Sequence, residues 1–95
     1  MNTPQAATAE ALSAALHQAL APSILEVIDE SAAHAGHAGT EGRTSGTHFR
    51  VRIGAAALQG KPRVAQHRLV YDALRHFTDA GLHALAIEIR PVPAD

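Results

Sequence analysis

Cysteine and tryptophan are absent from the 95-residue sequence, and its aromatic side chains are only Phe49, Tyr71 and Phe77. Without cysteine the chain can form no disulfide and can supply no thiolate as a metal ligand or a nucleophile. No apolar run approaches the ~20 residues of a membrane helix, and the first residues lack the basic and apolar regions of a secretory signal. The sequence therefore predicts a soluble, cytoplasmic protein.

Sequence motifs of catalysis are also missing. There is no Gly-x-Ser-x-Gly pattern, no glycine loop that opens a helix to cradle phosphate, and no obvious pair of acids flanking a cleft. The glycine-rich stretch at 31–46 leads into a strand, so it offers no helix N-terminus to an anion. We therefore expect a protein that is not an enzyme.

Acidic residues are absent between Arg43 and Tyr71, a stretch that carries six of the eight basic residues. One interpretation is a positive face, with Lys61, Arg63 and Arg68 available to contact phosphate. The other is a solvated surface balanced by acidic residues elsewhere, which the net charge of −1 slightly favours. His67 fits either a structural role or the same basic surface.

Hydrophobic periodicity predicts one small domain, at 9–95, after a flexible N-terminus at 1–8. Leu12, Leu16 and Leu20 recur at helical spacing after Thr8, a good N-cap, and Pro22 ends that helix. The expected elements are helices at 8–21 and 62–80, strands at 24–29, 47–53 and 82–90, and a short helical turn within 54–60. The apolar stripe expected on the longer helix consists of Val64, Val70, Tyr71, Leu74 and Phe77.

The order of these elements predicts an α+β fold with a three-stranded mixed sheet. The first two strands are joined by a loop and should be antiparallel, whereas a helical crossover makes the second and third parallel. The end of the first strand and the starts of the other two then share one end of the sheet. That end would gather His34, His37, His48 and His83, which makes a metal site a reasonable hypothesis. The alternative is that these histidines are simply solvated.

Four segments carry a family resemblance. LAPSILEVIDESAAHAGHAG, THFRVRI, LQGKPRVAQHRLVYDAL and LHALAIEI follow one another from Leu20 to Ile89 and resemble the BolA family, of the type with a histidine in the loop. Two positions depart from the pattern: Leu58 stands where the family often has Phe, and Gln66 where it often has Arg.

The resemblance implies a single class II KH-like domain, a monomer or weak homodimer when alone, that partners a monothiol glutaredoxin. In the family the two proteins share a [2Fe–2S] cluster, with glutathione as an additional ligand, in iron–sulfur trafficking or iron regulation. By resemblance the ligands from this chain are His83 and His34, with His37 as the alternative. Because the chain has no cysteine, the thiolates that such clusters usually need would come from the partner and from glutathione.

Two other functions stay open at this point. Bacterial BolA proteins are often described as transcriptional regulators, and residues 59–74 resemble a helix-turn-helix whose cations Lys61, Arg63 and Arg68 would contact DNA phosphates. The third interpretation is a small zinc-binding protein, with the ligand set His34, His37, His48 and His83.

Overall fold

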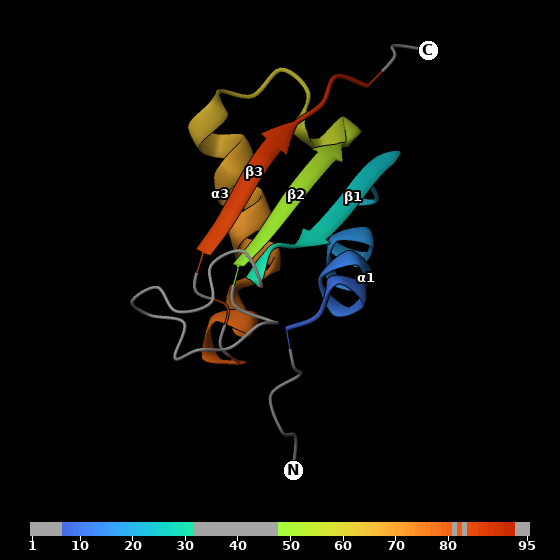
Figure 1. Ribbon diagram of the computed structural model, residues 1–95. Helices are drawn as coiled ribbons and strands as arrows, with labels where there is room; N and C mark the ends of the chain where they lie inside the picture. The colour runs from blue at the N-terminus through green and yellow to red at the C-terminus, as the bar shows by residue number, and fades with distance from the viewer. Residues whose placement is uncertain (1–6, 32–47, 81, 83, 93–95) are drawn as a thin grey trace.

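The computed structural model describes residues 7–31, 48–80, 82 and 84–92. Its elements in chain order are α1 (Ala9–Leu20), β1 (Ile24–Asp29), β2 (His48–Gly54), the 3₁₀ turn η1 (Ala56–Leu58), α3 (Arg63–Ala73), the 3₁₀ segment η2 (Arg75–Ala80) and β3 (Ala84–Ile89). The α-helices pack against one face of the sheet and leave the other face open (Figure 1). No helix of the described residues is long and apolar enough to cross a membrane.

The sheet has the expected topology. Strand β2 lies in the centre, antiparallel to β1 and parallel to β3. The α+β fold with a three-stranded mixed sheet is therefore confirmed, while the KH-like label stays a prediction. Since the parallel strands are joined by α3 and η2, the helical crossover runs from the far end of β2 back to its beginning (Figure 1).

Strand β2 has the alternation that its sequence predicts. Phe49, Val51 and Ile53 are buried against the helices, whereas Arg50 and Arg52 lie half-buried on the open face. Successive side chains of a strand point to opposite faces, so the first three form the floor of the core. The largest side chains that cover this floor are Leu12, Leu16, Leu58, Val70, Leu74 and Phe77.

Helix α1 begins and ends as its residues predict. The Thr8 hydroxyl accepts a hydrogen bond from the Ala11 N–H at 3.0 Å, which is the N-cap bond. At the other end Ala21 adopts a left-handed conformation with φ 46°, and its N–H donates to the His17 carbonyl. Pro22 follows directly and cannot extend the helix.

The prediction of one continuous helix at 62–80 is wrong. Helix α3 ends at Ala73, because Leu74 leaves the helical region at φ −110°, ψ 9° and donates instead to the Tyr71 carbonyl. The chain then continues as η2, in which residues three apart align on one face. This places Leu74 and Phe77 together in the core.

The predicted stripe on this helix is also partly wrong. Val64 is 75% exposed and Tyr71 is 49% exposed, while Val70, Leu74 and Phe77 are buried. The buried members are spaced four and then three residues apart, as expected for the face of a helix that continues as a tighter 3₁₀ turn.

Candidate functional site

One end of the sheet brings together three chain segments that are far apart in the sequence. Asp29, the last residue of β1, pairs with Phe49, and Phe49 pairs with Leu85 of β3. One step further, His48 at the start of β2 pairs with Ala84 at the start of β3. The register thus confirms that the end of β1 and the starts of β2 and β3 lie at the same end.

A buried serine joins two of these segments. The Ser31 hydroxyl accepts a hydrogen bond from the His48 N–H at 3.0 Å and lies 3.4 Å from the His48 carbonyl, to which it can donate. The Glu30 N–H also donates to the His48 carbonyl, at 2.8 Å, and the Ser31 N–H donates to a carboxylate oxygen of Asp29. These bonds fix the residues on both sides of the segment 32–47.

The metal ligands predicted for this end fall mostly outside the described residues. His34, His37 and His83 are not among them, so their geometry is not part of the site described here. His48 is described, and it lies half-buried on the open face. Within the described ranges no group of three or more His, Cys, Asp or Glu side chains is placed to hold a metal ion.

The open face of the sheet has a shallow pocket beside the starts of β2 and β3. The lining combines one acidic, two basic and four apolar residues from all three segments, namely Glu30, His48, Phe49, Arg50, Ala84, Leu85 and Ala86. A partner that docks at this end would therefore meet both charge and apolar surface.

Charged side chains form a ladder across the rest of the open face. The Arg50 guanidinium donates to Glu30 at 2.9 Å and to Glu88 at 2.8 Å. Arg52 donates to Glu26 at 2.9 Å and reaches the other oxygen of Glu88 at 3.3 Å. Glu88, which also accepts from Arg90, is therefore the central acid of this network.

These contacts shift the pKa values of the groups involved. Hydrogen bonding from Arg50, and secondarily from Arg52, lowers the pKa of the Glu88 carboxyl, although its partial loss of hydration acts in the opposite direction. The pKa of Arg50 is raised, first by its hydrogen bond to Glu30 and then by that to Glu88. All the side chains are partly in contact with water, so each pair contributes little to stability.

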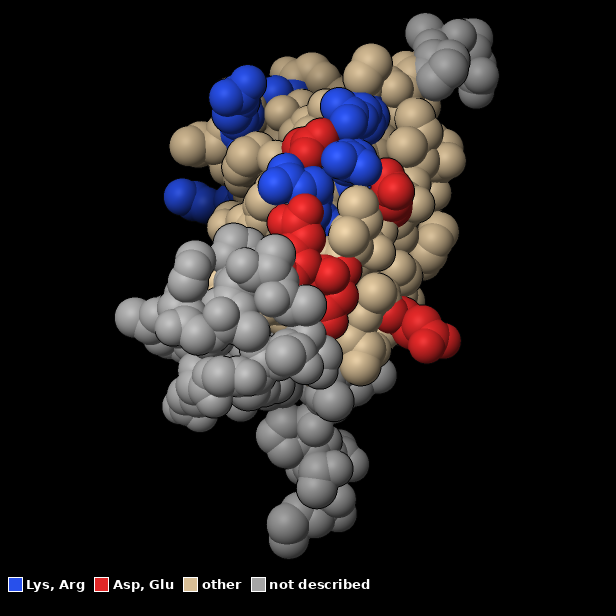
Figure 2. Space-filling model, viewed as in Figure 1, with Lys and Arg blue, Asp and Glu red and all other residues tan. Residues whose placement is uncertain are grey.

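For the two arginines of the sheet, the ladder decides whether the basic stretch forms a positive face or a surface balanced by acids. Arg50 and Arg52 are balanced by acids from β3, from β1 and from Glu30, which follows β1. Figure 2 accordingly shows red and blue side chains interleaved on the viewed face, where no broad positive field is visible. The balanced-surface interpretation is confirmed for these two arginines.

The cations of the helix-turn-helix-like region behave differently. Lys61, Arg63 and Arg68 are exposed, and no ion pair within the described part of the chain involves them. The Gln66 side chain donates to the Leu58 carbonyl at 2.8 Å and ties α3 to η1. His67 is half-buried and lines a hollow between α3 and β3, so it lies apart from Lys61 and Arg68, which line another hollow on α3.

Comparison with known proteins identifies the family. A family model described as BolA-like protein matches residues 16–92, which include all the strands and both α-helices in whole or in part. The chain belongs to the BolA-like family.

Two relatives are similar over most of this chain. An uncharacterised protein of Sinorhizobium sp. is 47% identical over 79 residues, which make up 83% of this chain and 85% of that protein. Protein BOLA1, chloroplastic, of Arabidopsis thaliana is 49% identical over 73 residues, or 76% of this chain and 46% of that protein. The chain therefore spans less than half of this plant relative.

A solved BolA structure confirms the fold. The BolA domain of SufE1 from Arabidopsis thaliana has a TM-score of 0.76 and 41% sequence identity, with 87% of this chain and 90% of that chain covered. The α+β arrangement described above is therefore the BolA arrangement.

Two features of this BolA-like site were not predicted from the sequence. Ser31 is the first residue of the glycine-rich stretch, for which the sequence predicts no buried side chain, yet it is fully buried. Glu88 was not expected to join Arg50 and Arg52, and the structure pairs it with Arg52 of β2. The predicted strand order and direction do not fix the register, which decides this pairing.

Proposed function

We propose that this BolA-like protein acts as the partner of a monothiol glutaredoxin and shares with it a [2Fe–2S] cluster that glutathione helps to hold. Its role would be iron–sulfur trafficking or iron regulation, without enzymatic activity of its own. The proposed ligands from this chain are His83 and one loop histidine, His34 or alternatively His37.

The observation that carries this proposal is the pairing of His48 with Ala84. It fixes the starts of β2 and β3 as neighbours, and His83 directly precedes Ala84 in the sequence. The loop that contains His34 and His37 is bounded by Ser31 and His48, which are hydrogen-bonded to each other. The described residues that flank both proposed ligand segments therefore lie at the same end of the sheet.

The chemistry of the chain supports a shared cluster over one of its own. Iron–sulfur clusters usually need thiolates, and this chain has none. Imidazole can replace part of a thiolate set, with a higher reduction potential as the result. The partner and glutathione would supply the thiolates that complete the set.

Anaerobic cluster reconstitution with a cytoplasmic monothiol glutaredoxin and glutathione tests the proposal. Visible absorption and circular dichroism are recorded for the wild type and for the variants His83→Ala and His34→Ala. His17→Ala is the matched control, since His17 is exposed on α1. The proposal predicts a heterodimer spectrum that His83→Ala alters and His17→Ala leaves unchanged. A spectrum identical to that of the glutaredoxin homodimer would contradict it.

A second candidate function is DNA binding by a transcriptional regulator. It is favoured by the exposure of Lys61, Arg63 and Arg68, cations without a described acidic partner. It is weakened by the pairing of Arg50 and Arg52 with acids, because these two cations then offer less positive charge to DNA phosphates. A duplex mobility-shift assay at low salt tests it: a shift that is lost on alanine substitution of the three cations supports regulation.

The zinc-binding alternative ranks third. Three of its four proposed ligands, His34, His37 and His83, lie outside the described residues, so its support is the sequence alone. Metal analysis of the protein as purified, with the same alanine variants, tests it.

The cytoplasmic location also stays a proposal, because one relative carries a chloroplastic name.

A further inference from the structure

Strand β3 forms one edge of the described sheet, because only β2 pairs with it. The Arg90 N–H, just past the end of β3, donates to the Ile53 carbonyl of β2 at 2.8 Å. Alternate residues of a strand direct their backbone groups to opposite sides, so Ile87 and Ile89 direct theirs away from β2. These groups face the open edge.

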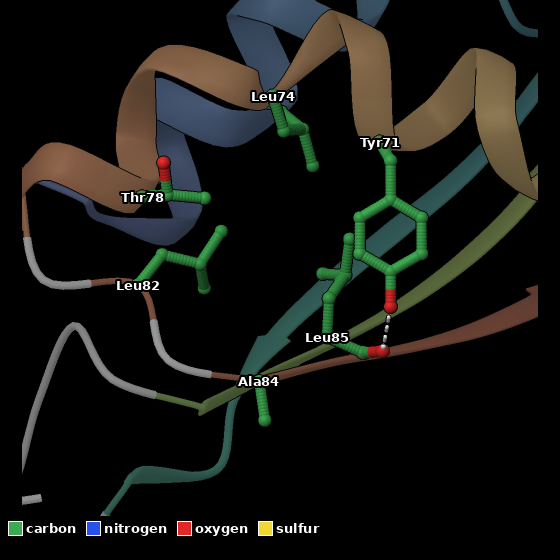
Figure 3. Close-up of a pocket in the computed structure, with 6 residues that line it drawn as sticks. All are labelled: Tyr71, Leu74, Thr78, Leu82, Ala84 and Leu85. Carbon is green, nitrogen blue, oxygen red and sulfur yellow. Dashed lines mark hydrogen bonds between the residues drawn. The ribbon is translucent and has the colours of Figure 1, made fainter. Parts of the chain in front are cut away.

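A side chain confirms this orientation. The Tyr71 hydroxyl donates a hydrogen bond to the Leu85 carbonyl at 3.1 Å (Figure 3). By the same alternation this carbonyl is directed away from β2. Tyr71 therefore occupies the edge at Leu85. Further along the strand, no hydrogen bond within the described ranges reaches the outward groups of Ile87 and Ile89. Such an open row is a template for another extended chain.

Two hollows of different chemistry lie along this edge. The first is mainly apolar, and Figure 3 shows its lining: Tyr71, Leu74, Thr78, Leu82, Ala84 and Leu85. The second contains the cation Arg63 with the polar side chains of Gln66 and His67, beside Ile87, Glu88 and Ile89. The Glu88 carboxylate is already paired with three arginines, Arg50, Arg52 and Arg90. Arg63 is exposed and takes part in no ion pair within the described part of the chain.

We propose that the β3 edge binds an extended peptide segment of a protein partner, which adds to the sheet as a fourth strand. One side chain of this segment is acidic and faces Arg63 and His67, while another is apolar and enters the hollow beside Tyr71. Side chains on one face of a strand are two residues apart, so the two recognised positions alternate with one that faces solvent.

An acidic peptide fits this edge better than other occupants do. A second copy of this chain, paired edge to edge, would bring Arg63 close to the Arg63 of its mate, and like charges disfavour that. A nucleic acid offers phosphates to Arg63, but it has no alternating N–H and C=O groups to pair with Ile87 and Ile89. The edge surface differs from the proposed cluster ligands and does not depend on them.

Amide hydrogen exchange of the full-length, ¹⁵N-labelled protein tests the proposal. The probes are short threonine-rich peptides with one Leu and one Glu two positions apart, in both orders, and matched peptides with Lys in place of Glu. We expect one Glu peptide to slow exchange at the Ile87 and Ile89 amides by roughly tenfold or more near saturation. The Ala86 and Glu88 amides already belong to the ladder with β2 and should not change.

Two variants separate this edge from a general basic surface. Arg63→Glu should weaken binding of the Glu peptide roughly tenfold, because it turns one attraction into a repulsion. Arg68→Glu makes the same charge change on a different hollow of α3 and should leave the affinity unchanged. Unchanged exchange at Ile87 and Ile89 with every peptide would overturn the proposal. So would equal losses in both variants together with binding of a DNA duplex, which would assign the surface to nucleic acid.

Discussion

The hydroxyl of Ser31 and the backbone N–H of His48, 17 positions apart in the sequence, are joined by a hydrogen bond of 3.0 Å. Ser31 is fully buried, so this bond is made away from bulk water. It holds Ser31, which follows β1, against His48, the first residue of β2. The two boundaries of the segment 32–47 are therefore fixed relative to the sheet, whatever that segment binds.

Ser31→Ala should lower the free energy of unfolding by about 1–3 kcal/mol, because a buried backbone donor loses its acceptor. Urea denaturation followed by far-UV circular dichroism measures the change. Ser23→Ala is the matched control, since Ser23 is exposed just before β1. Equal losses of stability in the two variants would show that the buried bond contributes nothing beyond a surface serine.

Glu88 makes the stability of the protein depend on acid pH. Its pKa is lowered in the folded state by Arg50 and Arg52, so the folded protein holds its proton less tightly than the unfolded chain does. The resulting stabilisation is present above the unfolded pKa of about 4.3 and is lost as the pH falls through the lower folded value. Glu88→Gln should therefore reduce stability at pH 7, and the loss should shrink as the pH falls below about 4.3.

The matched control for this pH experiment is Glu26→Gln. Among the described residues Glu26 bonds only to Arg52, and its side chain is 56% exposed, against 30% for Glu88. Unfolding in urea at several pH values should show a smaller loss for this variant, because Arg52 keeps its contact with Glu88. A loss for Glu88→Gln that stays constant from pH 7 to pH 3 would contradict the assigned role of the carboxylate.

The sheet could be predicted from the sequence because its signals are local and agree with one another. Phe49, Val51 and Ile53 alternate with polar residues, which fixes the buried face of β2. The kind of connection, a loop or a helical crossover, then decides which strands are antiparallel and which are parallel. The meeting of three segments at one end of the sheet follows from these two facts, and the register confirms it.

The end of α3 could not be predicted in the same way. No glycine or proline marks Leu74, and its apolar side chain continues the helical pattern. The change to a 3₁₀ segment depends on packing, because Leu74 and Phe77 both become buried when the turn tightens. Ser31 is a similar case, since only the tertiary fold determines that its hydroxyl faces the backbone of β2.

Two glycines are required for different physical reasons. A Cβ atom at Gly54 would lie 2.9 Å from Cγ2 of Val92 and 3.0 Å from the carbonyl oxygen of Arg90, whereas one at Gly60 would meet nothing within 4 Å. Gly60 instead has φ +75°, which favours glycine. Gly54→Ala should cost about 1–3 kcal/mol through overpacking, and Gly60→Ala about 1–2 kcal/mol through backbone strain.

Substitution by asparagine distinguishes overpacking at Gly54 from backbone strain at Gly60. Asn tolerates the left-handed region, so Gly60→Asn should recover part of the stability that Gly60→Ala loses. Gly54→Asn should be at least as damaging as Gly54→Ala, because its larger side chain meets the same neighbours. Thermal unfolding of the four variants measures both effects, and a recovery at position 54 in place of 60 would reverse the assignment.

Val64 and Val70 lie on the same helix, and the sequence pattern assigns both to the buried stripe, yet the structure separates them. Val70 is fully buried, whereas Val64 is 75% exposed near the start of α3. Val70→Ala should lower the free energy of unfolding by about 2 kcal/mol, since it removes two buried methyl groups and leaves a cavity. Val64→Ala should stay within about 0.5 kcal/mol of the wild type, because alanine is the better helix former and little burial is lost. Urea denaturation of the two variants compares the same chemical change at both positions. Similar losses at the two sites would mean that Val64 is covered in solution, and the register of α3 against the sheet would then need to be redrawn.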